Sequence, residues 1–487
     1  MKKIAVIGSG FSGLSAAAYS AQRGHEVHVF EKNSSLGGRA RKFTTDNGYV
    51  FDMGPSWYWM PDIIENFFID FNQKTSDFYE LIPLNPQFEM VFSDGTMKIP
   101  HDYSEMRRLF EDTEAGAGRK LDEFMSDAKY KYEVGMQDFV NKPCHSWFEF
   151  VSPKIARSAL KLDLLSNFHT FVRKYFKDPK LIMLMEFPVI FLGAAPKDIP
   201  ALYSLMNYGG YKLGTWYPMG GFSKIIDAMA EVAKNQGVHF HLNSTINSIQ
   251  INQNKATAIS VNGEDIEFDT VIASSDYHHT ENSLLPEKYR NYSEDYWKKR
   301  TFAPSCLIYY LGFKEKIPNL KHHTLFFEND LDLHTTEIYD DKKWPTKPLF
   351  YVCCPSKTDS NVAPENCENI FLLMPVATGL EDTEEVREKY FNEMITRLEK
   401  HTETTNLKSK LDYKKSYCIK DFKEDYNAYG GNAYGLANTL SQTAVLKPSL
   451  KNKKVNNLFY TGQLTVPGPG VPPSIISGKI AAHEATK

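Results

Sequence analysis

The sequence of 487 residues contains no uninterrupted apolar run of about 18 residues, the length that a membrane-spanning helix needs. The nearest candidate, Leu181 to Ala195, is interrupted by Glu186 and Pro188, so we expect a buried helix or a cavity wall there. No apolar signal segment separates Met1 from the first predicted strand. These absences argue against an integral membrane protein and against a secreted one.

Cysteine is also scarce: the chain has six, and no two are spaced as C-x-x-C. Two of them, Cys353 and Cys354, end the apolar run Leu349 to Val352 and are expected to be packed core residues. The pairs His278-His279 and His322-His323 lack ligand-like companions. We therefore expect a reduced, cytosolic protein and no metal site.

Neither sign of charge dominates the composition. The 56 Lys and Arg residues are balanced by 60 Asp and Glu, and the net charge of −4 argues against nucleic acid as a partner. No Ser-His-Asp, Cys-His or paired-carboxylate cluster is recognisable, an absence that is explained if a cofactor supplies the chemistry. Glu186, inside the apolar run, is the best charged candidate for a catalytic side chain. The 32 Phe and 27 Tyr residues suit a large apolar ligand or a thick core.

A glycine-rich turn near the N-terminus is the strongest signal that is present. A predicted buried strand, Lys3 to Ile7, precedes this turn, and a predicted helix, Leu14 to Arg23, follows it. The turn itself reads Gly8-Ser9-Gly10-Phe11-Ser12-Gly13. The first glycine allows the tight turn, the second lets the backbone approach a pyrophosphate, and the third lets the helix pack against the strand. The pattern predicts a dinucleotide site at the N-terminus of the helix.

The residues after the second predicted strand, Glu26 to Phe30, narrow the choice of dinucleotide. Glu31 stands where a carboxylate accepts hydrogen bonds from ribose hydroxyls, which disfavours the 2′-phosphate of NADP. Lys32 follows it. A second glycine pair, Gly37-Gly38, then allows the backbone to come close to a ligand, and Arg39 follows at once. An arginine placed there suits a second phosphate or a flavin contact, so FAD is favoured over NAD.

The C-terminal segment carries a second strong signal. A predicted strand, Asn457 to Gln463, delivers the chain to a Gly- and Pro-rich loop, Leu464 to Gly478. A helix is expected to start near Pro472 or Pro473 and to run to about Glu484, since proline is tolerated at the first helical position. Rigid backbone N–H groups and a helix N-terminus stabilise negative charge on phosphates or a reduced flavin.

The organisation predicts an α/β fold in which the nucleotide domain is assembled from discontinuous segments. A helix is predicted over Phe222 to Lys234, and four further strands are expected to complete the first sheet: Val238 to Leu242, Ile246 to Ile251, Ala256 to Val261 and Asp269 to Ser274. We assign residues 1–83, 214–303 and 421–487 to a Rossmann-like FAD-binding domain. Residues 84–213 and 304–420, with strand-like runs Cys306 to Phe313 and Ile370 to Val376, form a mixed α+β substrate domain.

Taken together, these motifs resemble the bacterial-type phytoene desaturases, FAD-dependent carotenoid desaturases of the amine oxidase-like superfamily. Besides both termini, the resemblance includes Phe51 to Pro61, Gly430 to Leu436 and Ser441 to Ala444. The C-terminal signature departs from the usual one at Gln463, Leu464 and Val466, which places the chain in a divergent branch.

The resemblance implies roles for particular positions. Those that would hold the FAD are Gly8, Gly10, Phe11, Ser12, Gly13, Glu31, Lys32, Gly38, Arg39, Gly54, Pro55, Ser56, Ile246, Gly462, Gly470, Val471 and Pro472. Among them, Ile246 would meet the adenine, and Gly54 to Ser56 would face the flavin ring. Trp57, Tyr58 and Trp59 would line a substrate channel or serve as ordinary packing.

The implied reaction is the desaturation of a long hydrophobic carotenoid, with a hydride passing to flavin N5 and a proton leaving the adjacent carbon. A phytoene-type substrate is favoured. The alternatives are a later 3,4-desaturation of a hydroxylated or γ-carotene-type substrate, a soluble flavin amine oxidase, and a non-enzymatic isoprenoid-binding protein. The electron acceptor would be oxygen or a quinone.

A substrate dissolved in a bilayer requires membrane contact without a span. The segment Trp147 to Phe176 mixes aromatic and apolar residues with Lys154, Arg157, Lys161 and Arg173, which is typical of an interfacial amphipathic helix or of a core helix with a basic face. We expect a membrane-associating region near 147–195. The protein would then be cytoplasmic and peripherally bound to the inner face of the cell membrane.

Overall fold

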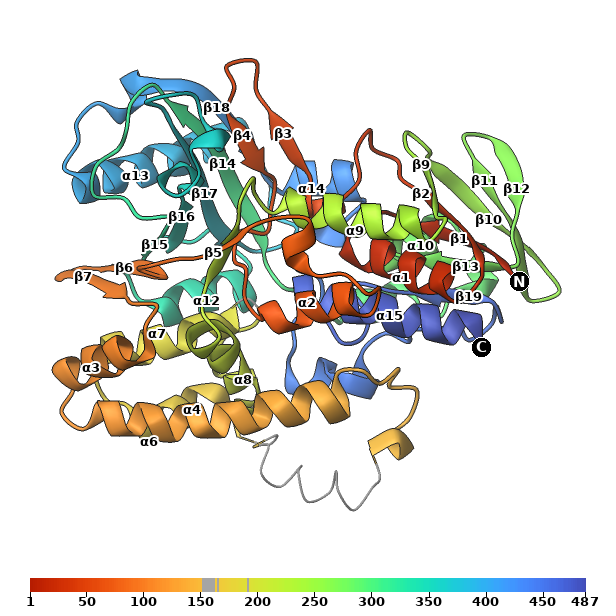
Figure 1. Cartoon of the computed structure of the whole chain (residues 1–487), viewed down its shortest axis with the longest axis horizontal. Helices are drawn as coiled ribbons and strands as arrows, with labels where there is room; N and C mark the ends of the chain where they lie inside the picture. Colours follow the sequence, from red (N-terminus) through yellow and green to blue (C-terminus); the bar gives the residue numbers. More distant parts are fainter. Residues whose placement is uncertain (151–162, 164–165, 191) are drawn as a thin grey trace.

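A parallel sheet of five strands lies toward the right of the molecule in Figure 1, in the order β19-β13-β1-β2-β9. These strands are β1 (Lys3–Ile7), β2 (Glu26–Phe30), β9 (His239–His241), β13 (Thr270–Ala273) and β19 (Leu458–Tyr460). The computed structural model describes residues 1–150, 163, 166–190 and 192–487. Nearly every residue of β1 and β13 is buried, as expected for a parallel sheet covered on both faces.

Helices cover one face of this sheet. Ile4 and Val6 share an apolar cluster with α1 (Phe11–Gln22), α9 (Ser223–Asn235) and α15 (Val471–Thr486). The first and last helices of the chain pack directly on each other, and α9 packs on α1 (Figure 1). The N- and C-terminal segments therefore form one structural unit.

A separate antiparallel sheet covers the other face, where Ala5 and Ile7 pack in a cluster with Ile249 and Ile259. It consists of β10 (Ile246–Asn252), β11 (Lys255–Val261) and β12 (Glu264–Glu267). The prediction that 246–251 and 256–261 complete the first sheet is therefore wrong. The two residues between β10 and β11, Gln253 and Asn254, have positive φ, so they close a tight hairpin and keep the pair antiparallel.

A seven-stranded, mainly antiparallel sheet lies on the left in Figure 1, in the order β18-β14-β17-β16-β15-β6-β7. Its strands are β6 (Phe88–Phe92), β7 (Gly95–Ile99), β14 (Ser305–Phe313), β15 (His323–Phe326), β16 (Phe350–Cys353), β17 (Glu368–Val376) and β18 (Leu411–Tyr417). Helix α13 (Glu384–Thr402) covers one face, and its Phe391, Met394 and Leu398 pack in a buried cluster with Leu307 and Leu372.

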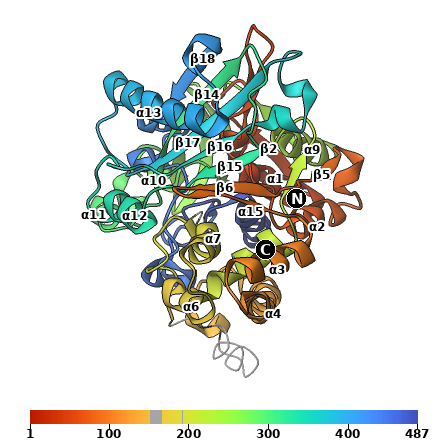
Figure 2. The same cartoon turned by 90° about the vertical axis from the view of Figure 1, so that its left-hand side faces the viewer.

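A layer of helices lies below this sheet in Figures 1 and 2. It contains α3 (Tyr103–Thr113), α4 (Ala117–Val134), α6 (Phe168–Tyr175), α7 (Pro179–Ile190) and α8 (Leu205–Asn207). Shorter elements connect the layers: β3 (Lys42–Thr44), β4 (Val50–Asp52), α2 (Pro61–Ile69), β5 (Leu81–Pro83), β8 (Trp216–Pro218), α10 (Tyr277–Ser283), α11 (Glu294–Lys298), α12 (Leu331–Tyr339) and α14 (Ile419–Tyr426).

The predicted α/β fold class is confirmed, and most predicted elements are present with shifted ends. Helix α1 begins at Phe11 rather than Leu14, and α15 begins at Val471. The segment 181–195 is largely the buried helix α7, with Pro188 inside it, as expected. The division into two domains stays a prediction. None of the helices in the described parts of the chain is long and apolar enough to cross a membrane.

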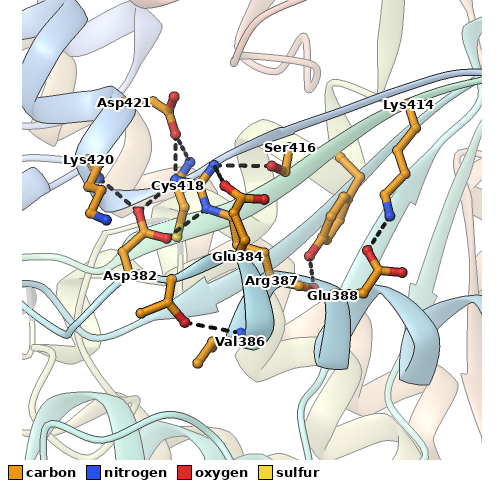
Figure 3. A network of polar contacts seen from close by, with 12 residues as sticks. Asp382, Glu384, Val386, Arg387, Glu388, Lys414, Ser416, Cys418, Lys420 and Asp421 are labelled. Carbon is orange, nitrogen blue, oxygen red and sulfur yellow. Dashed lines mark hydrogen bonds and ion pairs between the residues drawn. The ribbon is translucent and has the colours of Figure 1, made fainter.

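A buried ion-pair network fixes α13 to β18 and α14 (Figure 3). The guanidinium of Arg387 donates from Nε and Nη2 to the two carboxylate oxygens of Asp382, each over 2.7 Å, and from Nη2 to Asp421 over 2.8 Å. A fourth bond, of 3.0 Å, runs from Nη1 to the Ser416 hydroxyl. Arg387 is 7% exposed and Asp382 is 2% exposed, so each charge depends on the others for solvation.

Candidate active site

The glycine turn after β1 has the geometry that a phosphate-binding loop requires. Gly8 has φ +98°, a conformation that side chains disfavour, and its N–H donates to the carbonyl of Phe30 over 2.8 Å. A Cβ on Gly13 would lie 2.1 Å from the Gly8 carbonyl oxygen, so only glycine lets α1 start this close to the strand. Gly10 is the N-cap of α1, and a Cβ on Gly10 would meet no atom within 4 Å, so the space beside it is open.

The carboxylate of Glu31 is buried next to this turn. One oxygen accepts from the Ser9 N–H and hydroxyl, over 3.1 and 2.6 Å, and the other accepts from the Asn33 N–H and side-chain amide, over 3.0 and 2.8 Å. Both oxygens are thus saturated by protein donors. A ribose hydroxyl at Glu31 would have to replace the Ser9 hydroxyl or the Asn33 amide.

Two further predicted positions lie next to Glu31. The carbonyl of Glu31 accepts from Ser244 N–H over 2.8 Å, which holds the segment leading into Ile246 beside the turn. The ammonium of Lys32 donates to the backbone carbonyl of Glu424. The structure therefore places the segment that leads into Ile246 beside Glu31, and Lys32 joins the strand end to α14.

Arg39 follows a place where the backbone at Gly38 lies close to the backbone at Gly10. Gly38 has φ +54°, and a Cβ there would lie 3.2 Å from the Cα of Gly10, so the two glycine segments touch. The guanidinium of Arg39 donates from Nη2 to the Asn432 carbonyl over 3.3 Å and lies over the Tyr426 ring. Its buried Nε has no hydrogen-bond partner among the described residues. Such a donor at the cavity edge fits an anionic or carbonyl-bearing ligand.

The C-terminal loop is tied to the same site. Gly462 donates its N–H to the Ser477 hydroxyl over 3.0 Å, and a Cβ on Gly462 would lie 3.0 Å from the hydroxyl of Ser12. That Ser12 hydroxyl shares a 2.8 Å hydrogen bond with Ser274. Ser15 of α1 donates to the carbonyl of Ile475 over 2.6 Å. The two ends of the chain are joined by hydrogen bonds at the predicted cofactor position.

A cavity of about 380 Å³ extends from this junction between the seven-stranded sheet and the helical layer. The predicted cofactor and substrate residues that line it are Phe11, Arg39, Gly54, Pro55, Ser56, Trp57, Trp59, Gly470, Val471 and Pro472. Phe187 and Ile190 of α7 also line it, so the expected cavity-wall role of this segment is confirmed. Among the described lining residues there is no Asp or Glu, and Arg39 is the single Lys or Arg.

The aromatic segment 57–59 divides between the cavity and the core because alternate side chains of an extended segment point in opposite directions. Trp57 stacks on the His323 ring with 4.3 Å between centroids, and Trp59 meets Trp57 edge to face at 5.3 Å. Tyr58 is 1% exposed and shares a 2.9 Å hydrogen bond with Tyr79. Trp57 and Trp59 therefore lie at the predicted channel, whereas Tyr58 is a packing residue.

Glu186 does not line the cavity. Its carboxylate pairs with Arg173 and lies 3.2 Å from Nδ1 of His169. Burial raises the pKa of Glu186 to about 7, against the opposing effect of Arg173. The geometry gives Glu186 a structural role in joining α6 to α7 and no contact with the cavity.

Several polar residues of the cavity were missed at the sequence level. Tyr351 donates or accepts a 3.0 Å bond with the Ser56 hydroxyl and a 2.6 Å bond with His323 Nδ1. Asn438 is 3% exposed, and its side-chain oxygen has no partner in the part of the chain that the structure describes. Both residues lie in stretches without a recognisable motif, and only the fold brings them to the cavity.

The middle of the predicted amphipathic membrane segment, including Lys154, Arg157 and Lys161, lies outside the described residues. In its described part, α6, Phe171 packs on Phe124 of α4 with 5.4 Å between ring centroids. This helix therefore turns its apolar face toward the core.

The residues of the turn fit an FAD: open backbone beside Gly10, an unpartnered arginine donor and a loop at the start of α15 meet at one end of an apolar cavity. The comparisons with known proteins agree. The family model described as flavin containing amine oxidoreductase matches residues 11–486.

The chain is similar along almost its whole length to two characterised relatives. It is 38% identical to the carotenoid 3,4-desaturase of Haloarcula japonica, over 99% of this chain and 97% of that protein. It is 29% identical to the 4,4′-diapophytoene desaturase of Staphylococcus aureus, over 100% of this chain and 99% of that protein. A solved structure, putrescine oxidase bound to putrescine, has the same fold, with a TM-score of 0.63 at 14% identity over 99% and 98% of the two chains. The chain therefore belongs to the flavin-containing amine oxidoreductases and, among them, to the carotenoid desaturases, which makes it an FAD-dependent oxidoreductase.

Proposed function

We propose that this enzyme desaturates a carotenoid held in the 380 Å³ cavity. The observation that carries the proposal is the wall of that cavity, which is lined by apolar and aromatic side chains and, within the described residues, by no carboxylate. An amine substrate is a cation, and a site for it gains from a carboxylate. A polyene has no charge and gains from burial alone.

FAD held at this end of the cavity would supply the two-electron acceptor for a hydride from one carbon of the substrate, with a proton lost from the neighbouring carbon. The residues of the chain position the substrate and exclude water. Trp57, Trp59 and Phe187 form a rigid aromatic wall, with the ring centroids of Trp57 and Phe187 5.4 Å apart. A rigid wall holds one C–C bond of a long chain in a fixed place, which is the main catalytic contribution that this site offers.

The substrate that we propose is the end of a carotenoid that undergoes 3,4-desaturation. Sequence motifs alone favour a phytoene-type substrate, but two observations support the later step. Identity is higher to the 3,4-desaturase, at 38%, than to the diapophytoene desaturase, at 29%. In addition, the unpartnered side-chain oxygen of Asn438 lines the cavity and suits a hydroxyl-bearing end group.

Expression in two strains tests the proposal, one strain accumulating phytoene and the other a hydroxylated γ-carotene-type carotenoid. We expect a product with one more double bond in the second strain, identified by chromatography and absorption. Conversion of phytoene alone would contradict the proposed 3,4-desaturation and would show that the substrate is of the phytoene type. Absence of new pigment in both strains, together with peroxide release from amines, would favour the amine oxidase alternative.

The variant Asn438→Leu tests the end-group contact. We expect it to lose conversion of the hydroxylated substrate while the protein keeps its flavin absorbance. Thr335→Val, at another polar position of the wall, is the matched control and should retain most conversion. Equal losses in both variants would argue against a specific contact with Asn438.

We also propose that the enzyme is cytoplasmic and binds peripherally to the inner face of the cell membrane, and that oxygen or a quinone reoxidises the flavin. Two large apolar side chains are exposed, Phe148 at 85% and Leu446 at 42%. Exposed apolar side chains of this size suit insertion into a lipid interface. The double variant Phe148→Ser, Leu446→Ser should lose liposome binding, whereas Ile69→Ser, at another exposed position, should keep it.

A further inference from the structure

A cluster of nitrogen and sulfur groups lies behind the loop that carries Ser56 and Trp57. His323 is the first residue of β15, His322 precedes it, and Cys353 ends β16, where it pairs across the sheet with His323. One ligand atom from each of the three residues lies within 4.8 Å of the others. The sequence next to the histidine pair contains no third metal ligand. The antiparallel pairing of β15 with β16 brings Cys353 next to the pair.

The hydrogen bonds of the two imidazoles follow the pattern of metal-binding histidines. His322 Nδ1 lies 2.7 Å from the Thr358 hydroxyl, and His323 Nδ1 lies 2.6 Å from the Tyr351 hydroxyl. Both Nε2 atoms are buried and have no partner among the described residues. A ligating histidine uses one nitrogen for the metal and gives the other N–H to an oxygen, so both rings have one nitrogen oriented and one available.

Burial keeps both imidazoles neutral, as metal ligation requires, but it also keeps the Cys353 thiol protonated. Burial lowers the pKa of His322 to about 3 and that of His323 well below its ordinary value, so both rings are neutral and able to ligate. Burial raises the pKa of the Cys353 thiol to about 12. A bound transition-metal ion displaces the thiol proton and removes this penalty.

The surroundings leave room for one more ligand. A cavity of about 20 Å³, enough for one water molecule, is lined by His322, Cys353 and Asp52. The Asp52 carboxylate accepts from the N–H groups of Phe222 and Ser223, over 2.7 and 3.1 Å, and its charge would offset that of a cation. The cavity adjoins two of the three ligands, His322 and Cys353, and a water there could complete the coordination of a metal ion.

We propose that His322, His323 and Cys353 bind one transition-metal ion of the zinc type. Two imidazoles and a thiolate select such an ion over magnesium or calcium, which prefer oxygen ligands. Ligand atoms in a tetrahedral zinc site are about 3.5 Å apart, so the cluster closes by roughly 1 Å on binding. A metal at His323 Nε2 fixes the proton on Nδ1, which then donates to Tyr351 at the wall of the larger cavity.

Cobalt(II) titration of the full chain, purified without a histidine tag, tests the site independently of carotenoid conversion. We expect one equivalent bound, with a near-ultraviolet sulfur-to-cobalt charge-transfer band and the visible spectrum of a four-coordinate ion. Cys353→Ser should lose the charge-transfer band. Cys354→Ser is the matched control, since Cys354 is the next residue, is equally buried and donates to Glu368 instead.

His322→Gln and His323→Gln should each weaken cobalt binding at least tenfold, and thermal unfolding of the metal-free proteins shows whether they fold. Cys353→Ser keeps the test decisive if a histidine variant does not fold. Binding without the sulfur band, a band that persists in Cys353→Ser, or less than one-tenth equivalent bound after dialysis would each overturn the proposal.

Discussion

The carbonyl oxygen of Gly8 occupies the space that a Cβ on Gly13 would need, with only 2.1 Å between them. This contact lets α1 start at Phe11, after a turn of only three residues beyond β1. Gly13 thus serves the backbone packing, whereas the space beside Gly10, at the N-cap of the helix, is open.

The two glycines are expected to respond differently to alanine. Gly13→Ala forces the turn apart and should destabilise the protein by about 3 kcal/mol or abolish soluble expression. Gly10→Ala meets no atom within 4 Å and has φ −70°, so it should fold normally but bind FAD at least about tenfold more weakly, because the methyl group occupies the space for the pyrophosphate. Flavin absorbance per chain and thermal unfolding measure both effects. Full flavin content in Gly10→Ala would contradict this assignment.

Arg39→Met is expected to lower FAD occupancy while the protein remains folded, because the variant removes the cavity-lining guanidinium whose Nε lacks a described partner. Arg41→Met is the control. Arg41 is ion-paired with Asp425 at 2.7 Å and does not belong to the described cavity lining. Similar flavin loss in the two variants would mean that Arg39 acts through general packing.

Glu186 should make stability depend on pH between about 4.5 and 7. Burial raises its folded pKa to about 7, so in this window the folded state holds a proton that the unfolded state has lost. The free energy of unfolding therefore falls as the pH rises through the window, by up to about 3 kcal/mol. Chemical denaturation of wild type and Glu186→Gln at several pH values checks this, and the slope that belongs to Glu186 should vanish in the variant. An unchanged slope would show that Arg173 keeps the carboxylate charged.

Removing Arg387 should be among the most damaging substitutions outside the active site. Arg387→Met leaves the buried carboxylate of Asp382 without its partner and should reduce the free energy of unfolding by about 3–5 kcal/mol. Lys414→Met, which removes a more exposed ion pair with Glu388, should lower it by less than about 1 kcal/mol. The double variant Arg387→Met, Asp382→Leu should recover much of the loss, because neither charge then remains buried.

The sequence predicts the glycine turn well because that turn depends on local backbone geometry. Gly8, Gly13 and Gly38 are fixed by positive φ or by contacts too close for a side chain, and such requirements leave a readable pattern. Strand β1 was predicted with its observed ends for a similar reason, since a continuous apolar run bounded by glycine defines a buried parallel strand.

Sheet membership was harder to predict. Strands β10 and β11 have the alternation of a sheet with one solvated face, and the left-handed pair Gln253 and Asn254 makes them a hairpin. The alternation of buried and exposed residues predicts both strands, but it does not indicate which sheet they join. The cavity residues Tyr351 and Asn438 and the neighbour Cys353 of His323 depend on contacts between distant segments, for which a single sequence contains no local signal.

The packing of α1 against α15 also sets an order of events during synthesis. Gly478 fits against the carbonyl oxygen of Ser12, only 2.3 Å from where its Cβ would lie, and the loop at Gly470 forms part of the cavity wall. A growing chain on the ribosome has already exposed β1 and α1 while α15 is still unmade. The apolar face of α1 therefore stays uncovered until almost the whole chain has been synthesised. A complete flavin site can form only after the segment 471–486 has left the ribosome.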